Sequence, residues 1–262
     1  MSKDDSSVPD LRSPSISRRV TGILYSLTER EGGLSVRAVA EEAGSSRSAT
    51  HRILQMLADE GYAEIREQGR YTVGPKLIEL AARVFGVVPL IRVADAIMVR
   101  LVQEVGETCY LAVYSASDTV ATFVHRVESD EPVRHIQPLG SRLPLHVGAV
   151  GKAILAASPS IDLDDLDITR DAPRVPVNRK DLKRDVSKAR ELGYAVSVQE
   201  RLSGVAAVAS ALRSGEDVIG ALSVAIPVSR VPANGLDSIG ETVKSYSLEL
   251  SAAMQAMGAK RF

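Results

Sequence analysis

The chain is short of residue types that several functions need. Its 262 residues include one cysteine, no tryptophan and only 4% aromatic residues. A single cysteine excludes an internal disulfide and is typical of a reducing cytoplasm, and scarce aromatics argue against a surface that stacks on unpaired bases. The net charge is −1, so any attraction to nucleic acid has to come from a local cluster of basic residues.

Long apolar runs are missing too. No uncharged apolar stretch reaches the roughly 20 residues that cross a membrane, so we expect no membrane partner. The first seventeen residues are rich in Ser, Asp and Pro, which predicts a disordered tail over residues 1–15 rather than a secretion signal. We therefore expect a cytoplasmic protein. With 45% hydrophobic residues, the chain is long enough for two modest globular domains.

The segment LPLHVGAVGKAILAAS, residues 143–158, contains a Gly-Lys pair like that of a phosphate-binding loop. Such a loop also needs a glycine five residues before the pair and a Ser or Thr directly after it. His146 and Ala153 hold those two positions. The segment therefore does not predict a nucleotide site, and no cofactor is expected. Lys152 is expected to face solvent or to cap a neighbouring element.

Apolar residues recur at helical spacing in three segments near the N-terminus, residues 18–30, 36–43 and 46–60. Gly44 permits the tight turn between the second and the third segment. The stretch YAEIREQGRYTVG that follows alternates, and a β-hairpin is expected to turn at Gln68-Gly69. Residues 16–74 are thus predicted to form a winged helix-turn-helix, the fold that places its last helix in a DNA major groove.

The outward face of the third segment is polar and basic, whereas the acidic residues nearby lie on the second segment or at the far end. Such side chains at the start of a recognition helix meet base edges and phosphates. Only ten basic and eight acidic residues lie between Arg12 and Lys76, so a helical bundle with a solvated charged face is the alternative. The residues predicted to contact double-stranded DNA are Ser46, Arg47, Ser48, His51, Arg52, Gln55, Arg66 and Arg70.

Residues 75–88 are predicted to form an apolar linker helix, which breaks at Val88-Pro89 before a second helix over residues 90–105. Two consecutive apolar helices carry more apolar surface than a spacer between two domains needs. We therefore expect them to be buried against the following domain or against a second copy of the chain. A homodimer would place two winged helix-turn-helix domains on one DNA site.

From Thr108 the pattern changes to the alternation of strands. TCYLAVYS and TVATFVHR are predicted to form a hairpin, VRHIQP a third strand, and residues 181–192 a helix. In YAVSVQE, VAAVASALR and VIGALSVAI, one set of alternate positions is mostly bulky and the other mostly alanine and serine. Because successive side chains of a strand point to opposite faces, the bulky face is expected to take the final amphipathic helix, residues 236–257.

The face of small residues has two interpretations. Small side chains let a helix pack closely against the sheet, or they leave a mostly apolar chamber with a few hydroxyls, which is typical of a small-molecule pocket. The helix that begins near Val147 would cover such a chamber. Its free amide groups would favour a carboxylate there.

Three stretches resemble, in their order and spacing, the IclR (isocitrate lyase regulator) family of bacterial transcription regulators. They are LSVRAVAEEAGSSRSATHRILQMLADEGY, GSRLPLHVGAVGKAILA and GYAVSVQERLSGVAAVA. The resemblance implies an α+β protein with an N-terminal winged helix-turn-helix and a linker helix used in dimerisation. Over residues 89–262 it implies a GAF-like α/β effector-binding domain with an antiparallel sheet.

Regulators of this family bind operator DNA as homodimers or dimers of dimers and respond to small organic acids or aromatic compounds. Family members often have a carboxylate at the position of Ser197 and a cysteine at that of Ala207, so a larger or less polar effector is expected here. Thr50 and Ser45 stand where the helix-turn-helix pattern is usually apolar, which predicts looser helix packing. The resemblance places the effector pocket at His146, Ala149, Val150, Ser197, Ala207, Ser223 and Ala225.

Two other functions are the alternatives. An enzyme would need convergent acid and base groups, but His125, His135 and His146 are not at the spacing of zinc ligands, and no Ser-His-Asp set can be identified. No catalytic and no metal-binding residues are therefore predicted, and Cys109, in an apolar strand, is expected in the core. A winged helix that binds another protein is the second alternative, and the small excess of basic charge is the only point in its favour.

Overall fold

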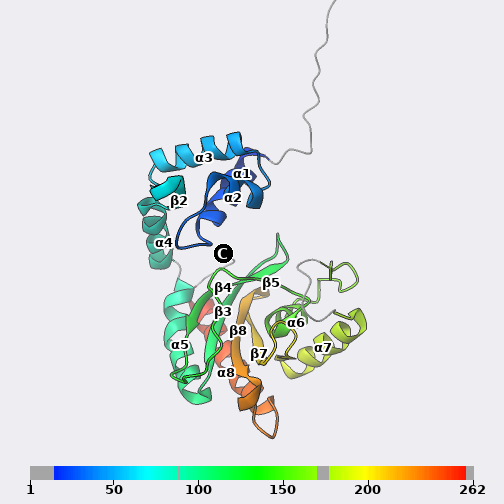
Figure 1. The fold of residues 1–262 in the computed structure, drawn as a ribbon. Helices are drawn as coiled ribbons and strands as arrows, with labels where there is room; N and C mark the ends of the chain where they lie inside the picture. The colour runs from blue at the N-terminus through cyan, green and yellow to red at the C-terminus, as the bar shows by residue number, and fades with distance from the viewer. Residues whose placement is uncertain (1–14, 88, 170–176, 258–262) are drawn as a thin grey trace, which may run out of the picture. The chain divides into compact units, whose positions relative to one another are not determined.

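The computed structural model describes residues 15–87, 89–169 and 177–257. The chain divides into two compact units, residues 1–87 and 88–262, which are drawn as ribbons in Figure 1. Apart from Ser15, the tail predicted to be disordered lies outside the described residues. The division falls at the predicted break between the two apolar helices.

Three helices and a two-stranded hairpin form most of the N-terminal unit. Each helix is preceded by a serine, Ser15, Ser35 or Ser46, whose side chain accepts a hydrogen bond from the third backbone N–H that follows. These caps satisfy amide groups that have no partner inside the helix. The apolar faces of the helices meet in one core around Ile23 and Leu54. The elements are α1 (Ile16–Leu27), α2 (Val36–Glu42), α3 (Arg47–Asp59), β1 (Ala63–Arg66) and β2 (Arg70–Val73).

The hairpin turns where the sequence predicts it. Gln68 and Gly69 have positive φ angles of 59° and 69°, the conformation that tight hairpin turns require. Tyr71 in β2 also pairs with Leu34, which ties the hairpin to the chain just before α2. The predicted winged helix-turn-helix is therefore confirmed.

Two consecutive helices follow the hairpin, α4 (Pro75–Val87) and α5 (Pro89–Val105). They differ in burial. In α5, Met98 and Leu101 are fully buried in the core of the C-terminal unit. In α4, by contrast, large apolar side chains are exposed.

The C-terminal unit contains a six-stranded sheet with the strand order β5-β4-β3-β8-β7-β6. Every neighbouring pair is antiparallel, and helices lie on both faces of the sheet (Figure 1). The predicted α+β class with an antiparallel sheet is therefore confirmed. The strands are β3 (Thr108–Ser115), β4 (Val120–Val127), β5 (Arg142–Pro144), β6 (Ala195–Val198), β7 (Val205–Ser214) and β8 (Asp217–Pro227). The helices after α5 are α6 (Gly148–Ala157), α7 (Arg179–Leu192) and α8 (Asp237–Ala256).

Different helices cover the two faces of this sheet, as the alternation of side-chain size predicts. Helices α5 and α8 lie on the bulky face, where Val208 and Leu222 are fully buried. Helix α6 lies on the small face, against alanines that include Ala209 and Ala221. Helix α7 packs against α6. The final helix therefore takes the face that was expected.

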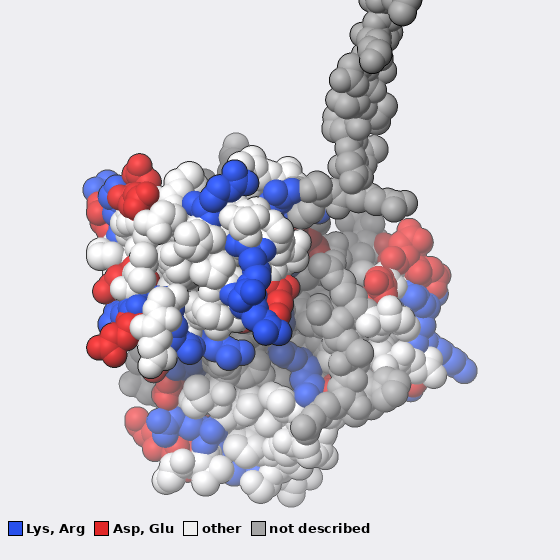
Figure 2. Space-filling model, turned by 45° about the horizontal axis from the view of Figure 1, so that its top comes forward, with Lys and Arg blue, Asp and Glu red and all other residues white. Residues whose placement is uncertain are grey.

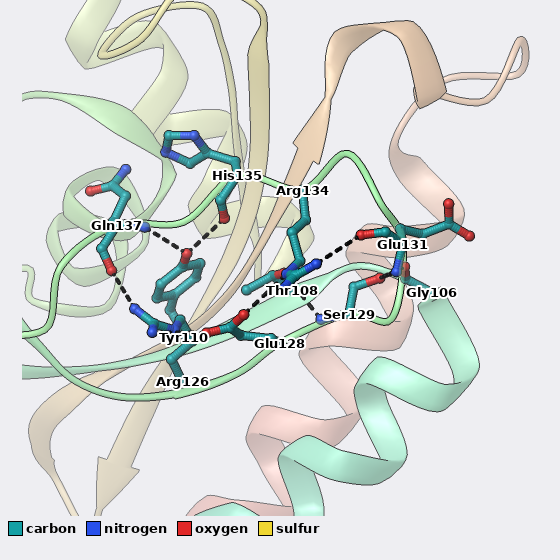
Figure 3. Close-up of polar contacts among 10 residues, drawn as sticks. All are labelled: Gly106, Thr108, Tyr110, Arg126, Glu128, Ser129, Glu131, Arg134, His135 and Gln137. Atoms are coloured by element: carbon teal, nitrogen blue, oxygen red, sulfur yellow. Dashed lines mark hydrogen bonds and ion pairs between the residues drawn. The ribbon is translucent and has the colours of Figure 1, made fainter.

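The prediction of a third strand over VRHIQP is wrong, because residues 133–138 form a loop and β5 pairs with β4 instead. The backbone of this loop bonds to side chains. The Tyr110 hydroxyl donates to the His135 carbonyl (2.8 Å) and accepts from the Gln137 amide (2.9 Å), and Arg126 donates to the Gln137 carbonyl (2.8 Å). Figure 3 shows these contacts around the Tyr110 ring. This loop is therefore held by hydrogen bonds to the side chains of Tyr110 and Arg126, and not by pairing with a strand.

Thr50 in α3 is 0% exposed, and its hydroxyl has no hydrogen-bond partner in the described part of the chain. A buried hydroxyl without a partner lowers stability because its hydration is lost without replacement. We expect Thr50→Val, which keeps the shape and removes the hydroxyl, to raise the free energy of unfolding by about 1 kcal/mol. Urea denaturation followed by circular dichroism measures the change.

The matched control is Ser46→Ala, which removes the cap of the same helix and should lower the free energy of unfolding by about 1 kcal/mol. A Thr50→Val protein that is less stable than the wild type would contradict the assignment of the hydroxyl as unpaired.

Candidate functional site

The exposed side of α3 is a polar and basic surface, which we call the recognition face. Its residues are Arg47, Ser48, His51, Arg52 and Gln55. The opposite side of α3, with Leu54, is buried in the core, so the face is presented on a fixed support. Ser46 has a structural role beside it, since its hydroxyl caps α3 by accepting from the Ala49 amide (3.3 Å).

Charge is unevenly distributed over this face. Arg47 and Arg52 form no ion pair with any other described residue, whereas the Gln55 side chain donates to Asp59 (3.0 Å) near the C-terminal end of the helix. Figure 2 shows Lys and Arg atoms running across the front of the N-terminal unit, with most acidic atoms toward its edges. The N-terminal half of α3 therefore carries two cations, Arg47 and Arg52, that are free to meet an anion.

The two arginines of the hairpin differ from each other. Arg66 is exposed, and its only described partner is the exposed Glu64 (3.4 Å). Arg70 instead donates to the carbonyls of Gly32 (2.9 Å) and Gly33 (2.6 Å). The DNA contact at Arg70 stays a prediction, and its guanidinium group also braces the hairpin against the loop before α2.

A pocket, which we call the sheet pocket, opens on the small face of the C-terminal sheet. Its empty space is about 530 Å³ including the mouth, of which the centre of a water molecule can reach about 50 Å³. That is room for about four water molecules. The pocket lies beside the start of α6 and the β6–β7 loop (residues 199–204). Six of the seven predicted effector residues line it, namely Ala149, Val150, Ser197, Ala207, Ser223 and Ala225.

Strand register brings these residues together from distant parts of the sequence. Ser197 in β6 is paired with Ala207 in β7, which is in turn paired with Ala225 in β8. In the adjacent row, Ala209 is paired with Ser223. Paired residues of neighbouring strands point to the same face, so the small side chains form one continuous floor.

Both interpretations of the small face hold, in different places. Ala209 and Ala221 are fully buried under α6, so there the small side chains serve close helix packing. At Ala207 and Ala225 the floor lies under the pocket instead. A Cβ added to Gly151 would lie 2.2 Å from the Leu145 carbonyl oxygen, which shows how tightly this part of the unit is packed.

The N-terminus of α6 is already engaged by a carboxylate of the chain itself. The Gly148 amide donates to Glu200 in the β6–β7 loop (3.0 Å). The same loop sends Arg201 to the pocket wall, where its side-chain stem packs on Gly148: a Cβ there would be 3.1 Å from Arg201 Cδ. Gly148 also has φ of +79°, so both its conformation and its neighbour favour glycine.

Lys152 does not face solvent, contrary to one of the two expectations. It is 2% exposed, and its ammonium group lies 2.5 Å from Glu200 and 3.1 Å from Asp185 in α7. Glu200 therefore accepts from both Lys152 and the Gly148 amide. This buried ion pair fixes α6, α7 and the β6–β7 loop to one another beside the sheet pocket.

The histidines do not converge on one site. His146 is buried outside the pocket lining and borders a different groove with Lys152, so the structure does not join it to the other predicted effector residues. His125 pairs with Asp95 (2.8 Å), and no group of three metal-ligating side chains occurs in the described ranges. Cys109 is fully buried in the core, where burial raises the pKa of its thiol.

Nine of the fifteen described lining residues were not predicted from the sequence, and four of these nine supply aromatic or polar groups. Tyr110 and Phe123 form an aromatic wall, with ring centroids 4.7 Å apart, and Gln137 and Arg201 come from loops. The alternation of β3 and β4 carried no sign that these two rings face the small residues of β8. Arg201 follows Glu200 in the third family-like stretch, but loop residues give no periodic signal.

Two family models match the chain. The model of the IclR helix-turn-helix domain matches residues 18–66, and that of the C-terminal part of the bacterial transcriptional regulator IclR matches residues 82–252. The chain belongs to the IclR family. It is a DNA-binding transcription regulator. The two matched ranges contain the recognition face and the sheet pocket.

Curated relatives agree with this membership. The IclR-family chain is 30% identical to the HTH-type transcriptional repressor AllR of Escherichia coli (strain K12) over 243 residues, covering 90% of this chain and 89% of AllR. It is 27% identical to the acetate operon repressor of Salmonella typhimurium over 250 residues, covering 89% and 91% of the two chains. Both relatives are transcriptional regulators.

Solved structures show the same fold. A putative IclR transcriptional regulator from Silicibacter sp. TM1040 matches with a TM-score of 0.79 and 23% identity, over 92% of this chain and 96% of the other. An IclR homolog from Microbacterium hydrocarbonoxydans, solved in complex with 4-hydroxybenzoate, matches with a TM-score of 0.75 and 23% identity, over 92% and 100%. Among the described helices of the IclR-family chain, none is long and apolar enough to span a membrane.

Replacing Lys152 tests whether its ion pairs hold together the elements beside the sheet pocket. Lys152→Met keeps the apolar stem but leaves Glu200 and Asp185 without their shared cation. We expect it to lower the free energy of unfolding by about 1–3 kcal/mol, less than for a fully buried pair because both carboxylates are partly exposed. Urea denaturation of the full chain measures the loss.

Lys183→Met is the matched control, since it removes a lysine of α7 whose ion pair with Asp164 is exposed on both sides. That change should cost no more than about 0.5 kcal/mol. Equal losses for the two variants would show that the buried pair does not hold the elements together.

Proposed function

We propose that the chain acts as a homodimer in which the recognition face of α3 contacts the major groove of operator DNA. The observation that carries this proposal is the pair of cations, Arg47 and Arg52, exposed on the N-terminal half of a helix whose other side is fixed in a core. Arginine is suited to guanine edges and to phosphates. Ser48, His51 and Gln55 supply shorter polar contacts beside them, and Arg66 of the wing contacts a phosphate.

The dimer forms through α4. Ile78, Leu80 and Val84 of this helix are 63%, 49% and 46% exposed, and large apolar side chains exposed on a helix are typical of a surface that a partner covers. A second copy of the chain supplies an identical helix, so a two-fold interface between them is self-complementary. Two recognition faces then bind the two halves of one operator, and two dimers together would span a longer one.

The sheet pocket binds the effector, a small organic acid or aromatic compound. Its lining is mainly apolar, with two serines and few other polar groups, as in small-molecule sites generally. A homologous protein solved with 4-hydroxybenzoate supports an effector of this size. An effector that binds one arrangement of the dimer more tightly than another shifts the population between them and so changes operator affinity.

This function is regulation without turnover, carried out in the cytoplasm where the operator lies. Among the described residues that line the pocket there is no carboxylate, histidine or cysteine. These are the side chains that most often act as general acids or bases. The lining therefore favours binding over turnover.

The recognition face is tested by replacing Arg47. A DNA sequence enriched by the wild-type protein from a random pool serves as operator. Arg47→Ala removes a contact to a base or a phosphate, and we expect it to weaken operator binding roughly tenfold or more. An electrophoretic mobility shift titration at fixed salt measures the affinity.

Arg184→Ala is the control, because Arg184 is exposed on α7 in the other unit and should leave operator affinity unchanged. Unaltered affinity of the Arg47→Ala protein would mean that α3 does not present the DNA-contacting surface.

The proposed dimer helix is tested by combining Ile78→Glu with Val84→Glu. Charges on a buried apolar interface oppose association, so the variant is expected to have the molar mass of one chain where the wild type has that of two or four. Size-exclusion chromatography with light scattering measures the mass. Val133→Glu, at an exposed apolar residue of the C-terminal unit, should leave the mass unchanged, and a wild-type protein with the mass of one chain would refute the dimer.

A further inference from the structure

Arg201 is the one charged residue among the described residues that line the sheet pocket. The chain does not use its charge elsewhere, because its guanidinium group forms no hydrogen bond or ion pair with other described residues. Arginines that are only partly exposed normally have an anionic or carbonyl partner. The free cation therefore marks a place in the pocket where an anion would be stabilised.

Glu200, the residue before Arg201, already has hydrogen-bond partners within the chain. One oxygen of Glu200 accepts from the Gly148 amide (3.0 Å) and the other from Lys152 (2.5 Å). Both contacts lie on the side of the β6–β7 loop that faces α6 and α7, and Glu200 borders a different groove. The two consecutive loop residues therefore have different surroundings. Lys152 neutralises the charge of Glu200, whereas Arg201 lines the sheet pocket.

The surroundings of Arg201 leave it poorly hydrated. Its stem packs on Gly148 at the start of α6, and burial lowers the pKa of Arg201 below its usual value. Arginine nevertheless stays protonated near neutral pH. Burial and, to a smaller extent, the charge of Arg201 lower the pKa of His135 below its usual value. A bound carboxylate would accept the hydrogen bonds that the guanidinium group no longer donates to water.

The remaining walls describe the rest of the ligand. Tyr110 and Phe123 offer an aromatic wall, and Leu143 and Val205 add aliphatic contacts. The Tyr110 hydroxyl is engaged by the His135 carbonyl and the Gln137 amide, as Figure 3 shows, so this ring contributes mainly its apolar surface.

We propose that the effector is a monocarboxylate with an apolar body of about one aromatic ring, and that Arg201 holds its carboxylate. This inference rests on the proposed function of the sheet pocket. An Arg-carboxylate contact is charge-assisted and often bidentate, which makes it both strong and directional. The hydroxyls of Ser197 and Ser223, which bond to no other described residue, are available to a polar substituent on the ring. A second carboxylate would face the apolar wall without a cation.

The test compares each acid with its neutral amide of the same shape. Benzoate and 4-hydroxybenzoate, with benzamide and 4-hydroxybenzamide, are titrated into the full-length protein by isothermal titration calorimetry. The acids are expected to bind about tenfold or more tightly than the amides. In Arg201→Met, which keeps the stem that packs on Gly148, this preference should disappear, and in Arg201→Lys it should be partly retained. Arg184→Met, at an exposed arginine of the same unit, should behave as the wild type.

Equal affinity for acids and amides in the wild type would overturn the inference, as would an undiminished preference for acids in Arg201→Met. Failure of both acids to bind at millimolar concentration also overturns it. The wild-type comparison needs no variant, so it holds even if Arg201→Met is unstable. Operator binding is measured on the same samples: if the wild type binds its enriched DNA but no acid, the inference alone fails, whereas absence of specific DNA binding means that the proposed function fails.

Discussion

The size of the side chains on one face of the C-terminal sheet sets how closely α6 approaches it, and the site depends on that approach. Alanines such as Ala209 and Ala221 bring the helix close enough to bury it against the strands. The same face of small residues continues to the start of α6, where the sheet pocket opens between the strands and the first residues of that helix. One sequence feature therefore has two consequences, close packing at one place and a cavity at the next.

Polar contacts then fix the rim of this cavity. Lys152, Glu200 and the Gly148 amide join the start of α6 to the β6–β7 loop in a single buried network. Breaking such a network is costly because a buried charge would lose its partner, so the loop is held where Arg201 reaches the pocket wall. The Gly-Lys pair that looks like part of a phosphate loop thus serves the structure: its lysine neutralises a carboxylate of the chain.

In the N-terminal unit the elements could be predicted from the sequence, whereas the contacts of single side chains within the protein could not. Helical spacing and the Gln68-Gly69 turn were sufficient for the winged helix-turn-helix, since both are local properties of the backbone. Whether an arginine contacts DNA or the protein itself is not local. Arg70 bonds to the carbonyls of Gly32 and Gly33, far away in the sequence, and no pattern within the hairpin indicated that contact.

What the sequence determined by itself is periodic or motif-based: the order of the elements, the bulky and small faces of the sheet, and the stretches that mark the IclR family. These follow from residues a few positions apart, so they can be read along the chain. Only the tertiary structure decided that VRHIQP is a loop held by Tyr110, that Lys152 is buried, and that Arg201 rather than His146 reaches the pocket. The physical reason is that each of these depends on a partner brought near by strand register and helix packing, and such partners leave no periodic trace in the sequence around the residue itself.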